Sequence, residues 1–142
     1  MADVGGHHRH ERILAAVDRA DPAHPRVVAA LALERSAILL PVVVLPEVAY
    51  LVDRRHGATR AASVLERLVS GPWPVTGLES SDLRRATELM ARYADARIGF
   101  VDAAIVALAE RHGATRIYSL DRRDFSLVRP RHVAAFEVLP AA

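Results

Sequence analysis

Three carboxylates occupy sequence settings that ordinary surface acids do not have. Glu47 lies within the apolar stretch 42–48, Asp102 lies near the start of an almost wholly apolar segment, and Asp121 directly follows the apolar-rich segment 116–120. A carboxylate among apolar residues is costly unless it is paired, hydrogen-bonded or bound to a cation. Carboxylate oxygens suit hard divalent ions such as Mg²⁺ and Mn²⁺. If the fold brings these acids together, they would form a divalent-metal site.

Each of these acids also has an ordinary explanation. Glu47 and Asp102 lie near the starts of expected helices, where a negative charge is favoured by about 0.3–1 kcal/mol. Asp121 follows a strand at an expected turn, where aspartate is common. Convergence of the acids at one edge of a sheet would distinguish a metal site from these separate local roles.

Helices and short apolar strands must alternate to position the acids. Apolar periodicity and local start and stop signals predict helices over 11–20, 23–35, 46–56, 58–69, 82–93 and 100–112, and strands over 38–42, 73–78, 116–120 and 136–139. Ser80 or Ser81 is expected to cap the helix over 82–93, and residues 121–126 are expected to form a tight turn. This alternation predicts a parallel sheet in a three-layer α/β/α sandwich, which binds ligands beyond the carboxyl ends of its strands.

Composition favours one compact domain spanning residues 1–142. The chain is 51% hydrophobic, and its longest apolar run, 37–45, contains a proline and falls short of the ~18 residues expected of a membrane span. The start lacks the apolar core of a secretory signal, and the absence of cysteine excludes disulfides and thiolate zinc sites. We therefore expect a cytoplasmic protein with no membrane partner. The formal net charge of +2 does not by itself indicate nucleic-acid binding.

The segments around the three acids resemble those of PIN domains. The resemblance rests on the apolar strand leading into Pro46-Glu47, on the segment 93–103 around Asp102, and on the segment Tyr118-Ser-Leu-Asp-Arg-Arg-Asp-Phe125. It covers about residues 13–140 and is closest to the VapC toxins of bacterial type II toxin–antitoxin pairs. It implies a metal-dependent ribonuclease that hydrolyses RNA phosphodiester bonds with Mg²⁺ or Mn²⁺. It also implies a cognate antitoxin protein as partner and a homodimer.

The resemblance assigns roles to individual residues of the chain. The catalytic and metal-binding acids would be Glu47, Asp102 and Asp121, with Asp124 as an accessory ligand. Other residues would orient the site or contact RNA phosphate: Asp95 and Ser119 in the first role, and Arg54, Arg122 and Arg123 in the second. The metal ion would activate a water and stabilise charge on the phosphate during hydrolysis. Apolar residues near Tyr50, Leu51 and Leu65 suit either a dimer face, an antitoxin groove or ordinary core.

The first segment departs from the family pattern. PIN domains begin with a strand ending in Asp-Thr or Asp-Ser, and that aspartate is normally a direct metal ligand. Here the position falls on Arg9, in a segment, 4–12, rich in glycine and histidine. As written, the chain is expected to lack the first strand and the first ligand. An arginine there would place a cation where the metal should lie.

A frame shift offers one explanation for the atypical residues 1–12. Gly6 to Arg12 can be encoded as GGT CAT CAT CGA CAC GAG CGG, and the same letters read one base later give Val-Ile-Ile-Asp-Thr-Ser. The hypothesis is that this segment is an out-of-frame reading of the family's first strand. Sequencing the 5′ end of the gene tests it, because the hypothesis requires those codons.

Three other interpretations remain open at this stage. The chain could be a catalytically impaired PIN-fold module that binds antitoxin or dimerises without cleaving RNA, which Arg9 favours. The histidines of segment 7–10 could bind a metal, although histidine prefers Zn, Ni or Cu to Mg. A receiver-like α/β domain also has acids at strand ends, but the absence of lysine disfavours it. Finally, Arg-His-Gly-Ala-Thr-Arg occurs at both 55–60 and 111–116, which we interpret as chance.

Overall fold

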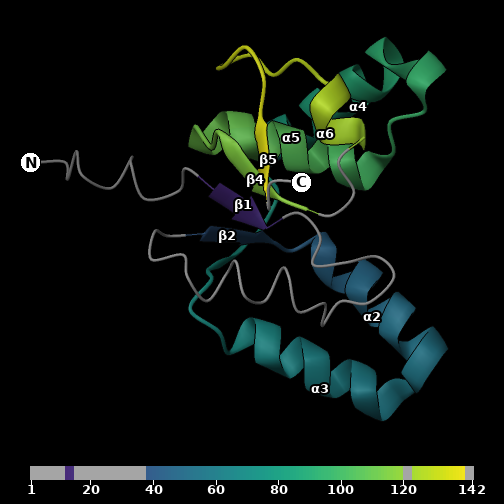
Figure 1. The fold of residues 1–142 in the computed structure, drawn as a ribbon. Helices are drawn as coiled ribbons and strands as arrows, with labels where there is room; N and C mark the ends of the chain where they lie inside the picture. The colour runs from purple at the N-terminus through teal and green to yellow at the C-terminus, as the bar shows by residue number, and fades with distance from the viewer. Residues whose placement is uncertain (1–11, 15–37, 120–122, 140–142) are drawn as a thin grey trace, which may run out of the picture.

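The computed structural model describes residues 12–14, 38–119 and 123–139, which form helices on both faces of a sheet (Figure 1). In chain order the elements are β1 (Arg12–Leu14), β2 (Ile38–Pro41), α2 (Val44–His56), α3 (Ala58–Val69), β3 (Val75–Thr76), α4 (Ser80–Arg92), the 3-10 helix η2 (Ala94–Ala96), α5 (Phe100–His112), β4 (Arg116–Tyr118), α6 (Arg123–Leu127) and β5 (Glu137–Leu139). None of the helices in these ranges is long and apolar enough to cross a bilayer.

The sheet has the order β3-β2-β1-β4-β5, and each of its pairings is parallel. Ile13 of β1 lies opposite Leu39 of β2 on one side and Ile117 of β4 on the other. Helices α2 and α3 lie on one side of the sheet, and α4, α5 and α6 lie on the other (Figure 1). The predicted α/β/α sandwich with a central parallel sheet is thus confirmed, and its strands all end at one edge.

Strand β1 corrects two expectations from the sequence. Arg12–Leu14 pairs with both β2 and β4, so the chain has not lost its first strand, and these residues are not helical. Without a strand there, β2 and β4 would leave unpaired backbone groups in the middle of the sheet. Ile13 and Leu14 are the first adjacent large apolar residues of the chain, which suits them to that place. The rest of the helix expected over 11–20, and the helix expected over 23–35, lie outside the described residues.

Two glycines set the helix boundaries that the sequence predicted best. Gly57 has φ +87° and separates α2 from α3, and Gly113 has φ +68° at the end of α5. Positive φ is strained for residues with a Cβ, so glycine is favoured at both positions. Helices α3 and α5 consequently begin and end at the predicted residues.

Two local expectations are wrong. The residue that caps α4 is Glu79, not Ser80 or Ser81, and it forms a capping box in which its backbone N–H donates to Asp82 Oδ2 at 2.8 Å. The segment expected to be a tight turn over 121–126 instead contains the short helix α6 in its described part. Phe125 is fully buried, and its anchoring in the core suits a helical turn at this point.

Helix α5 is the centre of the hydrophobic core. Its residues from Asp102 to Ala109 are all buried, because α4 and α6 pack against it on one side of the sheet (Figure 1). Small alanines alternate with Ile105, Val106 and Leu108 along this helix, which allows neighbouring elements to approach closely. A helix that is apolar on every face is expected to be enclosed in this way.

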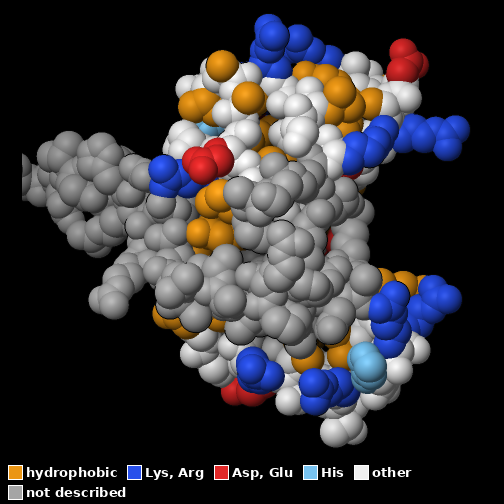
Figure 2. All heavy atoms as spheres, in the orientation of Figure 1, with side chains coloured by type: hydrophobic (Ala, Val, Ile, Leu, Met, Phe, Trp, Pro, Cys, Tyr) orange, Lys and Arg blue, Asp and Glu red, His pale blue; other side chains and the backbone are white. Residues whose placement is uncertain are grey.

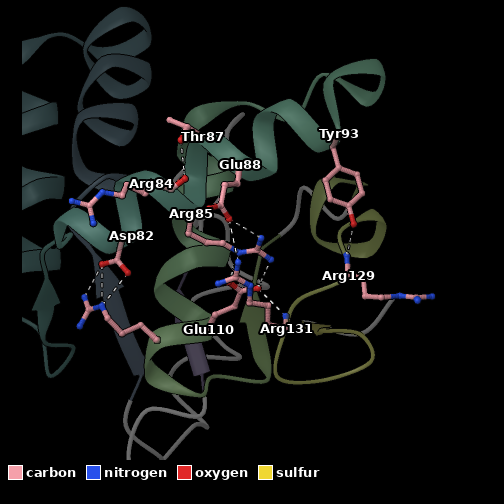
Figure 3. A network of polar contacts seen from close by, with 10 residues as sticks. Asp82, Arg84, Arg85, Thr87, Glu88, Tyr93, Glu110, Arg129 and Arg131 are labelled. Carbon is pink, nitrogen blue, oxygen red and sulfur yellow. Dashed lines mark hydrogen bonds and ion pairs between the residues drawn. The ribbon is translucent and has the colours of Figure 1, made fainter.

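A polar network joins α4, α5 and the segment before β5 (Figure 3). Arg85 Nε donates to Glu110 Oε1 at 2.7 Å, and the backbone N–H of Arg131 donates to Glu110 Oε2 at 2.8 Å. Burial raises the pKa of the Glu110 carboxyl, but the hydrogen bonds from Arg85 and Arg131 outweigh it and hold that pKa below its ordinary value. The charged form of Glu110 therefore stabilises the fold.

Glu110→Gln is expected to lower the free energy of unfolding by about 2 kcal/mol at pH 7, because the charge-assisted hydrogen bonds weaken. A carboxyl with a lowered folded pKa stabilises the protein above its unfolded pKa, about 4.3, and this contribution is lost as the pH falls through the folded pKa. The difference between the variant and the parent should therefore shrink between pH 7 and pH 3 in urea titrations. Glu66→Gln on the α3 surface serves as control, and an equal difference at both pH values would contradict the expectation.

Candidate metal and RNA cleft

A cleft of ≈ 420 Å³ lies where three helices begin. Its lining combines acids, arginines and one aromatic ring, namely Glu47, Arg97, Gly99, Phe100, Val101, Asp102, Arg123 and Asp124. Helix α2 follows β2 in the chain, and α6 follows β4. Two of the three helix starts thus follow the carboxyl ends of parallel strands, where ligands of such sheets bind, and the third, that of α5, follows η2.

Three acids of the cleft each lie in the first turn of a different helix. Glu47 and Asp124 are half-buried in α2 and α6, and Asp102 in α5 is only 5% exposed. The fold thus brings Glu47, Asp102 and Asp124 to one cleft. Asp121 lies outside the described residues.

The donor chemistry of the cleft fits a hard divalent cation, because the side chains that carry oxygen are carboxylates and none of the described residues that line it is a histidine or cysteine. Among the described residues, however, no three His, Cys, Asp or Glu side chains are gathered closely enough to hold an ion. A ligand set built on Glu47 and Asp102 therefore needs a further acid, and the sequence offers Asp121 directly after the segment that contains β4.

The other residues predicted for the site lie in different places. Ser119 is fully buried, and its backbone N–H donates to the Leu139 carbonyl at 2.7 Å. Asp95 is exposed in η2 and does not line the cleft. Arg54 is exposed on α2, where its guanidinium donates to Tyr50 Oη at 3.3 Å and stacks 5.9 Å from the ring centroid. Arg122 lies outside the described residues.

Arg123, which was predicted to contact RNA phosphate, lines the cleft, where its guanidinium already has protein partners. Its Nη1 atom is 2.7 Å from Asp124 Oδ1, and its Nη2 atom donates to the Ala96 carbonyl at 2.5 Å. These contacts join the start of α6 to the 3-10 helix η2. Arg123 thus fixes one wall of the cleft and neutralises part of the charge on Asp124.

Sequence reasoning missed Arg97 and Phe100. Arg97 has φ +56°, and among the described residues it is the one non-glycine residue with positive φ. Phe100 is the first residue of α5 and is 40% exposed. Their place in the same short segment as Asp102 was the available signal, but their exposure toward the cleft depends on the tertiary fold.

Basic side chains are spread over the surface beyond the two arginines of the cleft. In Figure 2 they lie at the right-hand edge of the molecule, above and below a hollow, and also at its top, left and lower edges. Of the apolar residues considered for a partner surface, Tyr50 is 61% exposed, whereas Leu51 and Leu65 are half-buried.

Comparison with known proteins gives consistent matches. The family model of the PIN domain matches residues 12–129. The ribonuclease VapC26 of Mycobacterium tuberculosis is 35% identical over 128 residues, which cover 90% of this chain and 95% of that protein.

Solved structures show the same fold. The crystal structure of M. tuberculosis VapC20, a toxin that cleaves the sarcin–ricin loop, matches with a TM-score of 0.72 and 23% identity over 86% of this chain and 97% of its own. VapBC2 of Rickettsia felis, solved with a DNA fragment from its promoter, matches with a TM-score of 0.68 and 18% identity over 91% and 98% of the two chains. The matched family model and the close ribonuclease relative together decide the assignment: the chain belongs to the PIN-domain family, in its branch of VapC-type ribonuclease toxins.

Proposed function

We propose that this chain is the toxin of a toxin–antitoxin pair and hydrolyses RNA phosphodiester bonds with Mg²⁺ or Mn²⁺ held by Glu47, Asp102 and Asp121. One observation carries the proposal: Glu47 and Asp102, from two different helices, line the same cleft together with Asp124 and two arginines. Acids of this kind suit a hard cation, and arginines suit phosphate.

Each acid of the cleft would have its own role in holding the metal ion. A divalent ion, when bound, supplies an activated water and offsets charge on the phosphate. Asp102 is held by the buried helix α5 and would fix the position of the ion, and Glu47 would approach it from α2. Asp124 would act as an accessory ligand, with its charge moderated by Arg123 at 2.7 Å.

Cleavage of a mixed structured RNA by the purified chain, with Mn²⁺ and with EDTA, tests the proposal. Glu47→Gln should lower the Mn²⁺-dependent rate by about 100-fold, because it removes a charged ligand of the ion that offsets charge on the reacting phosphate. Glu66→Gln, on α3 and bonded to Ser70 at 2.7 Å, is a matched control that should cut like the parent. Cleavage that persists in EDTA, or equal rates for the two variants, would contradict the assignment.

We extend the proposal to the partners and the compartment. VapBC complexes among the matched structures support a cognate antitoxin protein as partner and a cytoplasmic location. A homodimer is proposed as well, with the exposed Tyr50 on α2 as part of the partner surface. Light scattering of the chain alone measures the mass of the proposed homodimer. The same measurement with the cognate antitoxin added measures the mass of the complex.

A second candidate function is favoured by the start of the sequence. Arg9 replaces the aspartate that PIN domains place there, and β1 ends at Leu14, which is followed in the sequence by Ala15 and Ala16. Neither Arg9 nor the two alanines after β1 supply a carboxylate. The chain as written would then be a catalytically impaired module that binds antitoxin or dimerises without cleaving RNA. Antitoxin binding without Mn²⁺-dependent cleavage is the result expected of this alternative.

A further inference from the structure

Arg97 holds the available positive charge of the cleft. The second arginine there, Arg123, is committed to Asp124 and to the Ala96 carbonyl. Within the described part of the chain, Arg97 makes no side-chain hydrogen bond or ion pair, and it is exposed. Its φ of +56° costs free energy for a residue with a Cβ, and such strain is usually retained at functional sites. The strained backbone places a free guanidinium beside the carboxylates.

Phe100 provides an aromatic face in the same cleft. It precedes Asp102 by two residues at the start of α5, and it is 40% exposed although residues 102–109 of the same helix are buried. An exposed phenylalanine in a polar cleft leaves apolar surface in water, which a planar ligand can cover. Nucleobases stack on such rings when they are unpaired, whereas bases inside a duplex are already stacked.

We infer that Arg97 and Phe100 together hold one unpaired nucleotide beside the carboxylates, with its phosphate on the Arg97 guanidinium and its base on the Phe100 ring. The inference rests on the proposed ribonuclease function and narrows its substrate to RNA whose bases are accessible. Arg97 contributes charge without regard to base pairing. Phe100 makes binding selective for unpaired RNA, because only a base outside a duplex can stack on its ring. The two residues should therefore respond differently to paired RNA.

Binding of labelled RNA with the metal chelated separates these roles without cleavage. Phe100→Leu keeps apolar bulk but removes the ring, and it should weaken binding of a single strand about ten-fold while leaving binding of a duplex unchanged. Arg97→Gly should weaken both about ten-fold and lower the salt dependence of binding by about one phosphate contact. Because glycine tolerates positive φ, this variant should not lower the melting temperature. Leu83→Ala and Arg84→Ala on α4 are matched exposed controls.

A spectroscopic readout reports stacking directly. The parent chain has one tryptophan, Trp73, so Phe100→Trp adds a reporter at the cleft. Single-stranded RNA should quench its fluorescence beyond the parent's response, and duplex RNA should not. If Phe100→Leu and Arg97→Gly bind RNA like the α4 controls while the parent still cuts RNA with Mn²⁺, this inference falls and the ribonuclease proposal stands. A parent chain that neither binds nor cuts RNA overturns both.

Discussion

Asp102→Asn is expected to lower Mn²⁺-dependent RNA cleavage by about 100- to 1000-fold without unfolding the chain. Asp102 is 5% exposed in the first turn of α5 and lines the proposed metal cleft with Glu47. Asparagine has nearly the same shape, so the packing of the buried helix should be preserved. It lacks the negative charge, so affinity for a divalent cation should fall. The measurement is the initial rate of cleavage across a Mn²⁺ titration.

Thermal unfolding gives the same prediction a readout that does not depend on turnover. An ion present at about 100 times its Kd stabilises the native state by about 2.7 kcal/mol, which corresponds to roughly 10 °C for a domain of this size. The parent should show such a shift with Mn²⁺, and Asp102→Asn should show almost none. Asp53→Asn, exposed on α2, is the control and should shift like the parent. Retention of both cleavage and the thermal shift by Asp102→Asn would remove Asp102 from the metal site.

Restoring the family's first segment is expected to produce the second large effect. The altered chain carries Gly6→Val, His7→Ile, His8→Ile, Arg9→Asp, His10→Thr and Glu11→Ser. It gains an apolar segment that ends in a carboxylate, and it loses the arginine at the position that the resemblance assigns to the first ligand. We expect Mn²⁺-dependent cleavage at least about 100-fold faster than that of the chain as written. We also expect a higher melting temperature, because the restored segment can take the place of Arg12–Leu14 between β2 and β4 with three large apolar residues in succession.

A matched variant separates the strand from the ligand. The same restored segment with Arg9→Asn in place of Arg9→Asp should keep the gain in melting temperature but lose the gain in cleavage. Equal activity of the restored and the written chains would mean that the atypical segment does not limit catalysis. In that case the frame-shift hypothesis would lose its functional support, whatever the gene sequence shows.

The sequence predicted the elements whose boundaries are set by local chemistry. Helices α3 and α5 are delimited by Gly57 and Gly113, and their glycines need positive φ for reasons a sequence can reveal. The repeated Arg-His-Gly-Ala-Thr-Arg shows the limit of that reasoning. After Gly57 the residues Ala-Thr-Arg start α3, whereas after Gly113 they lead into β4. The same hexapeptide therefore continues as helix or strand according to what packs against it.

Strand β1 was missed for the same physical reason. The segment after Glu11 has helical periodicity, but a central place in the sheet between β2 and β4 demands a strand there. Tertiary pairing outweighs a local helix preference of a few tenths of a kcal/mol per residue.

The sequence pointed to acidic residues of the candidate site, but not to an arginine and an aromatic residue that also line it. The apolar settings of Glu47 and Asp102 at expected helix starts, together with the family resemblance, led to these two acids, which line one cleft together with the accessory Asp124. Asp121 and Arg122 remain predictions, because they lie outside the described residues. Arg97 and Phe100 could not be found from spacing, since their contribution depends on a left-handed backbone and on exposure toward the cleft.

The central strand β1 divides the described fold into two halves, and the acids of the cleft come from both. One half contains β2, β3, α2 and α3, and the other contains β4, β5, α4, α5 and α6. Within the described sheet, β1 pairs with β2 of the first half and β4 of the second (Figure 1). Glu47 belongs to the first half, and Asp102 and Asp124 belong to the second. A cation bound by acids of both halves would therefore link them directly and add to the connection that β1 makes within the sheet. Metal loading should then slow amide hydrogen exchange in β1, β2 and β4 more than in α3, whose residues do not line the cleft.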